Sequence, residues 1–373
     1  MKSEQKKYFY PLIYVGILFV ASFPLARGVE ISGTDASMWL ARVEEMKEYL
    51  KQGVLALYPS AELVEYYGGQ GRALDTNLWM LFPMILSLVG IGAESVYRIF
   101  MLCLQIGTLL SAWKLFSTLF QEKVVTVVGV LLYMTCPYRW YLCYDKGDIG
   151  RCVAWMLIPL LIWGFYRYAA KKERKYLLAA VLTLAGIGYA DNVMVWIVMG
   201  IAVLGSIWYR KLRLLVPVVL GGLLYLPGGL RFIKYLLIGA TDIANMPVET
   251  IMGKGYMPGR FFTVFFYPKD LPGLGAGLLC GVLLFLWLLA SGEKMPKQKY
   301  SFAGAISVLL LCLSLELFPW DLVQRAGGPL FRLISLINSP NIFFGLACVA
   351  LCVLAAGGIE GIVRKGKEKN GFI

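Results

Sequence analysis

Long apolar runs separated by short polar segments make up most of the chain. Several of the runs approach or exceed the roughly 20 residues that a helix needs to cross the hydrocarbon core of a bilayer. The pattern predicts an all-α polytopic membrane protein with a single transmembrane domain over residues 1–373. The runs lie at residues 8–26, 77–93, 95–119, 123–142, 152–169, 176–189, 191–209, 214–229, 273–291, 301–318 and 340–359.

Basic segments between the runs predict the orientation, because Lys and Arg are enriched on the cytoplasmic side of membrane proteins. If every run crossed the membrane, the basic segments 171–175 and 210–213 would lie outside. We therefore predict that the run 77–93, which contains Pro83 and ends in Gly-Ile-Gly, is a re-entrant or interfacial segment. The remaining runs give a bundle of about ten transmembrane helices with both termini in the cytoplasm.

This topology gathers four longer segments at the exterior face, namely residues 27–94, 143–151, 230–272 and 319–339. The first exterior loop contains a helix from Trp39 onward that carries its apolar side chains on one stripe, as is typical of a helix lying on a membrane surface. Asp35 precedes this helix. Its side chain could cap the helix, or its carboxylate could face a cavity between the spans, and the local sequence leaves both roles open.

Composition and charge add several exclusions. The chain is 59% hydrophobic, and its net charge of +13 reflects the basic segments that the topology places in the cytoplasm. No nucleic-acid-binding motif accompanies that charge, so a nucleic acid is not expected as a partner. The chain has no His, which excludes acid–base chemistry by His. Among the eight Cys, Cys143 and Cys152 flank one short loop and could pair.

Two local motifs accompany this layout. The first, GTDASMWLAR followed by YLKQG, supplies Gly33, Asp35 and Arg42. The second, CPYRWYLCYDKGDIGR, supplies Pro137, Tyr138 and Arg139 ahead of Gly147 and Gly150. The layout and the two motifs together resemble the GT-C superfamily of membrane glycosyltransferases and, more closely, the YfhO-type bacterial membrane proteins. The resemblance covers most of the chain.

The resemblance implies a GT-C-like bundle that transfers a sugar from a polyprenyl-phosphate donor to an envelope glycan or lipid acceptor at the exterior face. Such chemistry needs a carboxylate to deprotonate the acceptor hydroxyl and positive charge near the departing phosphate. We expect Asp35 to be the catalytic base and Asp148 the second catalytic acid, although Asp148 in KGDIG also suits a turn or a helix start. The expected substrate-binding residues are Arg42, Arg139, Lys146, Arg151, Asp191 and Arg260.

No cofactor is required by this scheme. Asp35 and Asp148 could together hold a divalent cation, Mg²⁺ or Mn²⁺, because hard cations accept oxygen ligands alone. The spacing of the carboxylates does not demand a metal, so no residue is assigned as a metal ligand. The protein is expected in the plasma membrane as a multi-pass protein in contact with membrane lipids.

Departures from the family pattern leave two alternatives open. Trp39 stands where these proteins usually have His, and Arg151 stands where they usually have Glu. The late segment NSPNIFF also lacks the Arg of the family motif. A non-catalytic GT-C-like membrane scaffold would tolerate these changes. A lipid or polysaccharide transporter is the other alternative, and it would favour charges inside the spans and repeated halves.

Overall fold

The computed structural model describes residues 3–26, 35–60, 63, 76–238, 255–263, 271–292, 297–325, 337 and 340–369. Regular secondary structure in these residues is entirely helical, and an isolated bridge between Tyr256 and Leu315 is the one extended pairing described. The all-α prediction is therefore confirmed.

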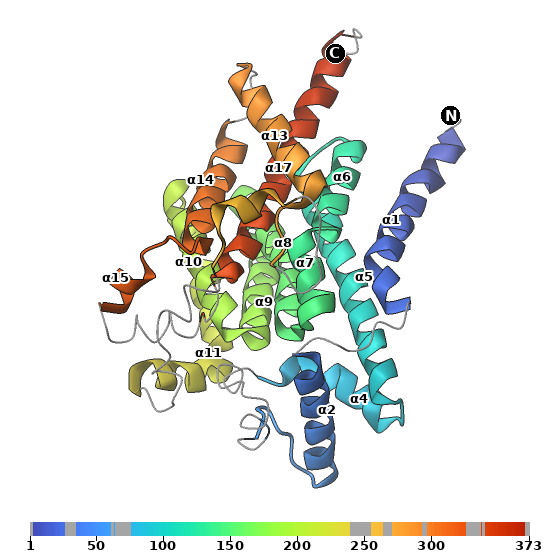
Figure 1. Ribbon diagram of the computed structural model, residues 1–373, viewed down its shortest axis with the longest axis vertical. Coiled ribbons are helices and arrows are strands. Elements are labelled where there is room, and N and C mark those ends of the chain that lie inside the picture. Colours follow the sequence, from blue (N-terminus) through green and yellow to red (C-terminus); the bar gives the residue numbers. More distant parts are fainter. Residues whose placement is uncertain are drawn as a thin grey trace.

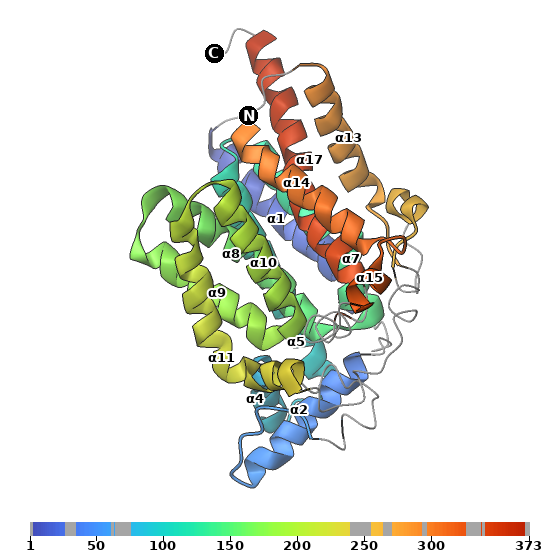
Figure 2. The ribbon, with the colours of Figure 1, turned by 90° about the vertical axis from the view of Figure 1, so that its left-hand side faces the viewer.

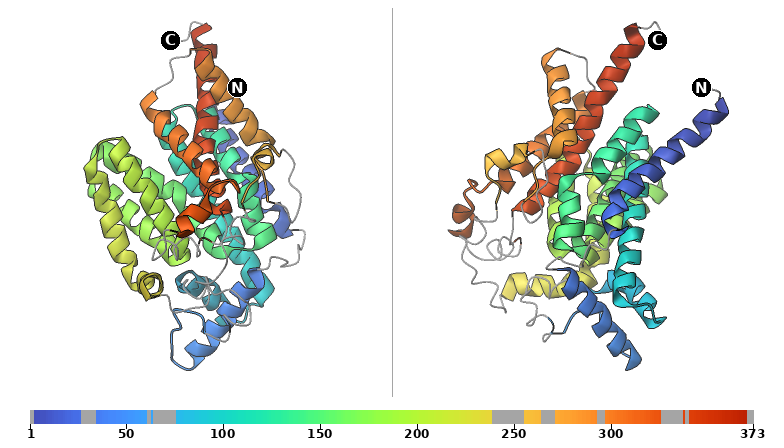
Figure 3. Two further views of the ribbon diagram at one scale, coloured as in Figure 1. Left: turned by 60° about the vertical axis from the view of Figure 1, so that its left-hand side comes forward. Right: turned by 45° about the vertical axis from the view of Figure 1, so that its right-hand side comes forward.

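The long helices run side by side and in alternating directions between two ends of the molecule (Figures 1 and 2). Both termini lie at one end, and α2 and α4 project from the other, which we call the α2 end (Figure 3). The α-helices are α1 (Ser3–Ala26), α2 (Ala36–Lys51), α4 (Leu81–Leu88), α5 (Ala93–Leu119), α6 (Lys123–Met134), α7 (Pro137–Trp140), α8 (Ile149–Lys171), α9 (Arg174–Ala190), α10 (Asn192–Trp208), α11 (Leu215–Ile238), α13 (Gly275–Ala290), α14 (Lys297–Ser314), α15 (Trp320–Arg325) and α17 (Asn341–Lys369). Short segments complete the list, namely the 3₁₀-helices η2 (Leu78–Met80), η4 (Leu212–Leu214) and η6 (Pro258–Phe262), and the π-helix η3 (Tyr141–Lys146).

Four helical stretches in the described residues are long and apolar enough to cross a membrane. They are Ala93–Leu119, Ile149–Lys171, Leu212–Lys234 and Asn341–Lys367. Further apolar helices, such as Phe9–Leu25 and Gly275–Ala290, are shorter. These lengths support a helical membrane protein, and the ten crossing helices and the orientation of the termini stay predictions.

The predicted non-spanning run 77–93 contains η2 and the eight-residue helix α4, and it ends at the first residue of α5. At about 1.5 Å of rise per residue, α4 covers about 12 Å, which is well short of the roughly 30 Å hydrocarbon core. The helix packs against α2 instead of continuing through the bundle (Figure 1). Ser87 Oγ donates a hydrogen bond to Glu44 of α2 at 3.0 Å.

Two predicted boundaries are wrong. The run 123–142 does not form one helix, because α6 ends at Met134 and the chain restarts as α7 at Pro137. The residue before a proline is biased toward extended backbone, and Cys136 has φ −55° and ψ 124°. The predicted exterior segment 230–272 starts too early, because α11 continues to Ile238. Phe232 keeps these last turns ordered by stacking on Trp196 at 6.2 Å.

Helix α17 lies at the centre of the second half of the bundle and packs against α13 and α14 (Figure 2). Small residues allow this close approach. A Cβ atom added at Gly281 of α13 would lie 2.6 Å from the Cβ of Ala355 in α17. Small side chains at helix contacts let backbones pack closely in membrane proteins. Near its start, α17 also contacts α7, where the ring of Phe344 lies 6.0 Å from that of Tyr138.

Candidate functional site

Five charged side chains form a continuous chain of ion pairs near the α2 end of the bundle. Lys146 Nζ lies 3.7 Å from Asp35 Oδ2 and 3.2 Å from Asp148 Oδ2. Arg151 Nε lies 3.5 Å from Asp148 Oδ2 and 3.2 Å from Asp191 Oδ2. We call these five residues the acid–base cluster. Their side chains range from 22% exposed at Lys146 to 4% exposed at Asp148, so most of the cluster is shielded from water.

A tight backbone approach joins α2 to the start of the cluster. The backbone N–H of Asp35 donates to the carbonyl of Lys146 at 3.1 Å. Gly147 follows with φ +68°, a left-handed conformation that favours glycine. A Cβ atom there would lie 2.6 Å from the Cβ of Ala36. Only a glycine therefore lets the first turn of α2 lie against this segment, and that contact brings Asp35 to Lys146.

A second glycine joins α8 to the ends of two other helices. A Cβ atom on Gly150 would lie 2.5 Å from the carbonyl oxygen of Ala190 and 3.2 Å from the ring of Trp39. Ala190 is the last residue of α9, and Asp191 follows it. The close approach at Gly150 thus sets Asp191 beside Arg151, one residue further along α8.

Two of the three carboxylates also cap helices. Asp148 Oδ1 accepts a hydrogen bond from the backbone N–H of Arg151 at 3.2 Å, and Asp191 Oδ1 accepts one from Met194 at 2.7 Å. Asp35 occupies the N-cap position of α2, but its side chain makes no capping hydrogen bond. The helix-start role weighed for Asp148 is therefore present, whereas the carboxylate of Asp35 is directed to Lys146.

The structure brings together five of the eight predicted site residues, and Arg42, Arg139 and Arg260 lie elsewhere. The Arg42 side chain is fully buried, donates to Asn77 Oδ1 at 2.7 Å and lies over the Trp39 ring at 4.4 Å. These contacts tie α2 to the segment that precedes α4. Arg260 is exposed on η6, and among the described residues no ion pair joins it to the cluster.

Arg139 is buried in a different polar network. Its guanidinium donates to the carbonyl of Met134 at 2.8 Å and to the side chain of Gln105. Gln105 in turn donates to the hydroxyl of Tyr144 at 2.8 Å, and Tyr144 donates to the carbonyl of Ala21 in α1. The network ties α1, α5 and α7 together. Substrate binding by Arg139 and Arg260 stays a prediction that these contacts do not support.

Aromatic side chains border the cluster, and sequence reasoning missed them. Tyr141 belongs to η3, and burial raises the pKa of its phenol above the usual range. Arg151 opposes that rise, while the carboxylates of Asp148 and Asp35 add to it, so the phenol lies within the field of the cluster. The ring of Tyr138 lies 6.2 Å from that of Tyr141. The aromatic run PYRWYLCY within the second motif is the sequence signal that could have indicated them.

The cysteines beside the cluster are free thiols. The sulfur atoms of Cys143 and Cys152 lie 3.3 Å apart and both side chains are buried. They therefore pack as small apolar side chains against the segment that carries Lys146 and Asp148.

The cluster does not suit a divalent cation. Lys146 Nζ already occupies the position between Asp35 and Asp148. In the described part of the chain no three acidic or cysteine side chains come together as metal ligands. We derive no step through a metal.

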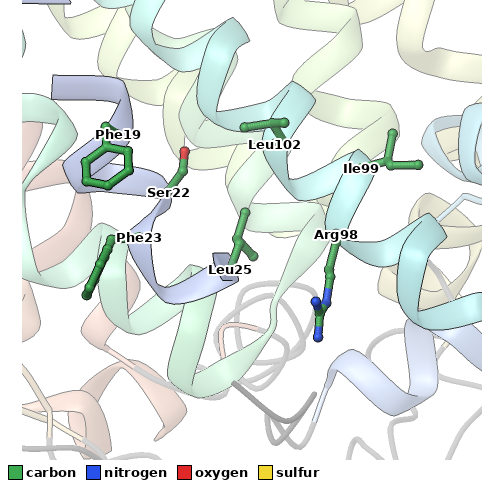
Figure 4. Close-up of a pocket in the computed structure, with 7 residues that line it drawn as sticks. All are labelled: Phe19, Ser22, Phe23, Leu25, Arg98, Ile99 and Leu102. Atoms are coloured by element: carbon green, nitrogen blue, oxygen red, sulfur yellow. The ribbon is translucent and has the colours of Figure 1, made fainter. Parts of the chain in front are cut away.

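One groove of about 300 Å³ lies between α1 and α5 (Figure 4). Apolar side chains form most of its wall, and Arg98 extends away from them at one end. None of the predicted site residues lines it. The lining residues are Phe19, Ser22, Phe23, Leu25, Arg98, Ile99 and Leu102.

Comparisons with protein-family models, with curated proteins and with solved structures find no match to this chain. The resemblance to the YfhO-type proteins and the GT-C superfamily therefore stays a prediction from the layout and the two motifs.

Proposed function

We propose that this chain is a GT-C-like membrane glycosyltransferase that transfers a sugar from a polyprenyl-phosphate donor to a cell-envelope acceptor. One observation carries the proposal. Asp35 and Asp148, which lie far apart in the sequence and in different predicted exterior segments, contact the same Lys146 ammonium at 3.7 and 3.2 Å. A carboxylate beside positive charge at one partly shielded position is the arrangement that the proposed chemistry requires.

Asp35 is the better candidate for the base. Its side chain is 18% exposed, against 4% for Asp148. Asp148 uses one oxygen to cap α8 and the other to contact Lys146 and Arg151. Asp35 has no capping role in α2. An incoming hydroxyl group can therefore reach Asp35 more easily, and Asp148 serves to position Lys146.

The proposed reaction exchanges one bond for another at the anomeric carbon. The acceptor oxygen forms a bond to that carbon and releases its proton to the carboxylate of Asp35. The bond from the anomeric carbon to the phosphate oxygen breaks, and its electron pair leaves with the lipid phosphate. Lys146 and Arg151 supply the nearest positive charge, which offsets part of the negative charge on the departing group.

A complementation experiment tests the assignment of Asp35. A deletion strain of the native host receives the wild-type chain, Asp35→Asn or the control Glu48→Gln, and the envelope glycans are profiled at matched protein levels. Glu48 is an exposed acid of the same helix that forms an ion pair with Lys51. We expect Glu48→Gln to restore the wild-type profile and Asp35→Asn to fail. Full restoration by Asp35→Asn would remove the catalytic assignment.

The non-catalytic scaffold is the second candidate, and a specific observation favours it. Within the acid–base cluster every cation already contacts carboxylates, and two of those carboxylates cap helices. Such a cluster can serve to hold α2, α8 and α10 together. In that case Asp35→Asn combined with Lys146→Met removes the pair without leaving an isolated charge, and the double variant should complement as well as the wild type.

A further inference from the structure

Several buried polar atoms near the acid–base cluster have no hydrogen-bond partner among the described residues. Three of them are Tyr138 Oη, Arg151 Nη1 and Asn341 Oδ1. Tyr138 is 0% exposed and Asn341 is 4% exposed. Buried polar groups are nearly always hydrogen-bonded, since leaving them unpaired forfeits their interaction with water. Unpartnered atoms of this kind indicate a ligand or a bound water.

The helices bring the three atoms to one region. The ring of Tyr138 lies 5.6 Å from that of Trp155, one turn after Arg151 on α8. The same ring lies 6.0 Å from that of Phe344, which is three residues after Asn341 on α17. Residues three or four apart share one face of a helix. Arg151 and Asn341 therefore lie on the helix faces that pack around Tyr138.

Aromatic rings flank this region. A Cβ atom on Gly345 would lie 2.7 Å from the Tyr138 carbon that bears the hydroxyl, so glycine gives the phenol room to lie along α17. The ring of Tyr256 stacks on the same Phe344 ring at 4.3 Å. Tyr141, which is only partly buried, connects Tyr138 to the surface.

The chemistry of the three atoms matches hydroxyl groups. Arg151 Nη1 is a donor, Asn341 Oδ1 is an acceptor and the phenol of Tyr138 can act as either. A hydroxyl group both donates and accepts, and faces of aromatic rings suit the C–H groups of a sugar. The adjacent cluster holds three carboxylates and two cations, so the cluster disfavours a further carboxylate on the sugar ring.

We propose that Tyr138, Arg151 and Asn341 form a subsite for the hydroxyl groups of an uncharged sugar, with acidic sugars excluded by the carboxylates of the cluster. The choice of a sugar rests on the proposed glycosyltransferase function. The subsite would hold the sugar next to Asp148 and on the route from Tyr141 to Asp35. The expected substrates of this subsite are therefore neutral hexoses rather than uronic acids.

Binding of matched sugars tests the charge argument. The full chain, purified in detergent, is titrated with glucose, galactose and mannose and with the corresponding uronic acids, and binding is followed by calorimetry and by the shift in Tm. We expect at least one neutral hexose to bind about tenfold or more tightly than its uronic acid, which corresponds to about 1.4 kcal/mol. Equal or tighter binding of the uronic acid would overturn the proposal, as would a lack of hexose binding.

Tyr138→Phe and Tyr133→Phe form a matched pair of variants. The Tyr133 hydroxyl donates to the carbonyl of Trp155 at 2.7 Å, so its removal should lower the Tm and leave the Kd for the hexose unchanged. The Tyr138 hydroxyl has no partner in the described part of the chain, so Tyr138→Phe should keep or raise the Tm of the unliganded chain and weaken hexose binding about tenfold. A Tm loss equal to that of Tyr133→Phe, with hexose binding intact, would show a permanently bound water instead.

The outcomes separate this subsite from the proposed catalysis. Asp35→Asn should keep the wild-type Kd for the hexose, because Asp35 supplies none of the three atoms of the subsite. Hexose binding that depends on Tyr138, together with full complementation by Asp35→Asn, would support the subsite and reject the transferase. Failure of Asp35→Asn to complement, with no hexose binding by the wild type, would support the transferase and reject the subsite.

Discussion

Removal of the Lys146 charge tests whether two distant acids share one cation. At an effective dielectric constant of about 20, unit charges at the observed 3.2 Å between Lys146 and Asp148 attract by about 5 kcal/mol. The 3.7 Å between Lys146 and Asp35 gives about 4.5 kcal/mol. Desolvation offsets most of either figure, and more water reaches Asp35 than Asp148.

Double-mutant cycles isolate the two pairs. The variants are Lys146→Met, Asp35→Asn and Asp148→Asn, and the Asn at position 148 keeps an oxygen that can cap α8. We expect a coupling energy of about 2 kcal/mol for Lys146 with Asp148, as for a shielded charge pair. For Lys146 with Asp35, where both side chains are about a fifth exposed, we expect about 1 kcal/mol.

The assay is reversible unfolding in mixed micelles, with the free energy of unfolding extrapolated to zero denaturing detergent. Lys51 with Glu48 provides the control cycle, because this pair is 55% and 59% exposed and should couple by less than about 0.5 kcal/mol. A coupling for Asp35 no larger than that control would mean that Asp35 and Asp148 do not share Lys146. The two-acid site would then have no basis.

Two further predictions concern the packing that positions the site. Gly150→Ala should lower the free energy of unfolding by about 1–3 kcal/mol, because the added Cβ atom would clash with Ala190 and Trp39. The control Gly200→Ala should be neutral or stabilising, because the space around Gly200 is open. Equal effects of the two variants in thermal unfolding would contradict the close approach at Gly150. The hydrogen bond from Lys47 lowers the pKa of Glu44, so ionised Glu44 stabilises the fold above pH 4.5 and this contribution is lost as the pH falls through the lower folded-state pKa. The Tm difference between wild type and Glu44→Gln should therefore close at acid pH, and a constant difference would argue against the pair.

The apolar runs predicted most helices because a membrane helix satisfies its backbone hydrogen bonds within one segment. The run 95–119 became α5 (Ala93–Leu119), and 152–169 became α8 (Ile149–Lys171). The ends of helices were less predictable, because tertiary packing extends them past the apolar run. α11 continues past residue 229 with Phe232 against Trp196, a contact that hydropathy does not encode.

The partners of the arginines were beyond sequence reasoning. Arg42 bonds to Asn77, 35 residues later, and Arg139 bonds to Gln105, 34 residues earlier. A motif gives the position of a residue along the chain but not the helix that its side chain meets. Both arginines stand at motif positions, and both hold helices together in the described part of the chain. Lys146 and Arg151 could be grouped with Asp148 because they lie within three residues of it.

The structural roles of the cluster residues determine which substitution can distinguish an enzyme from a scaffold. Gly147 and Gly150 are needed for the approach of α2 and α9, and Asp148 and Asp191 cap α8 and α10. A scaffold that had lost its chemistry would keep all four for the sake of its fold. Asp35 has no capping role, so the fold alone gives less reason to keep a carboxylate there. Replacement of Asp35 should therefore impair a glycosyltransferase and spare a scaffold. Replacement of Asp148 would impair both, because it removes a helix cap.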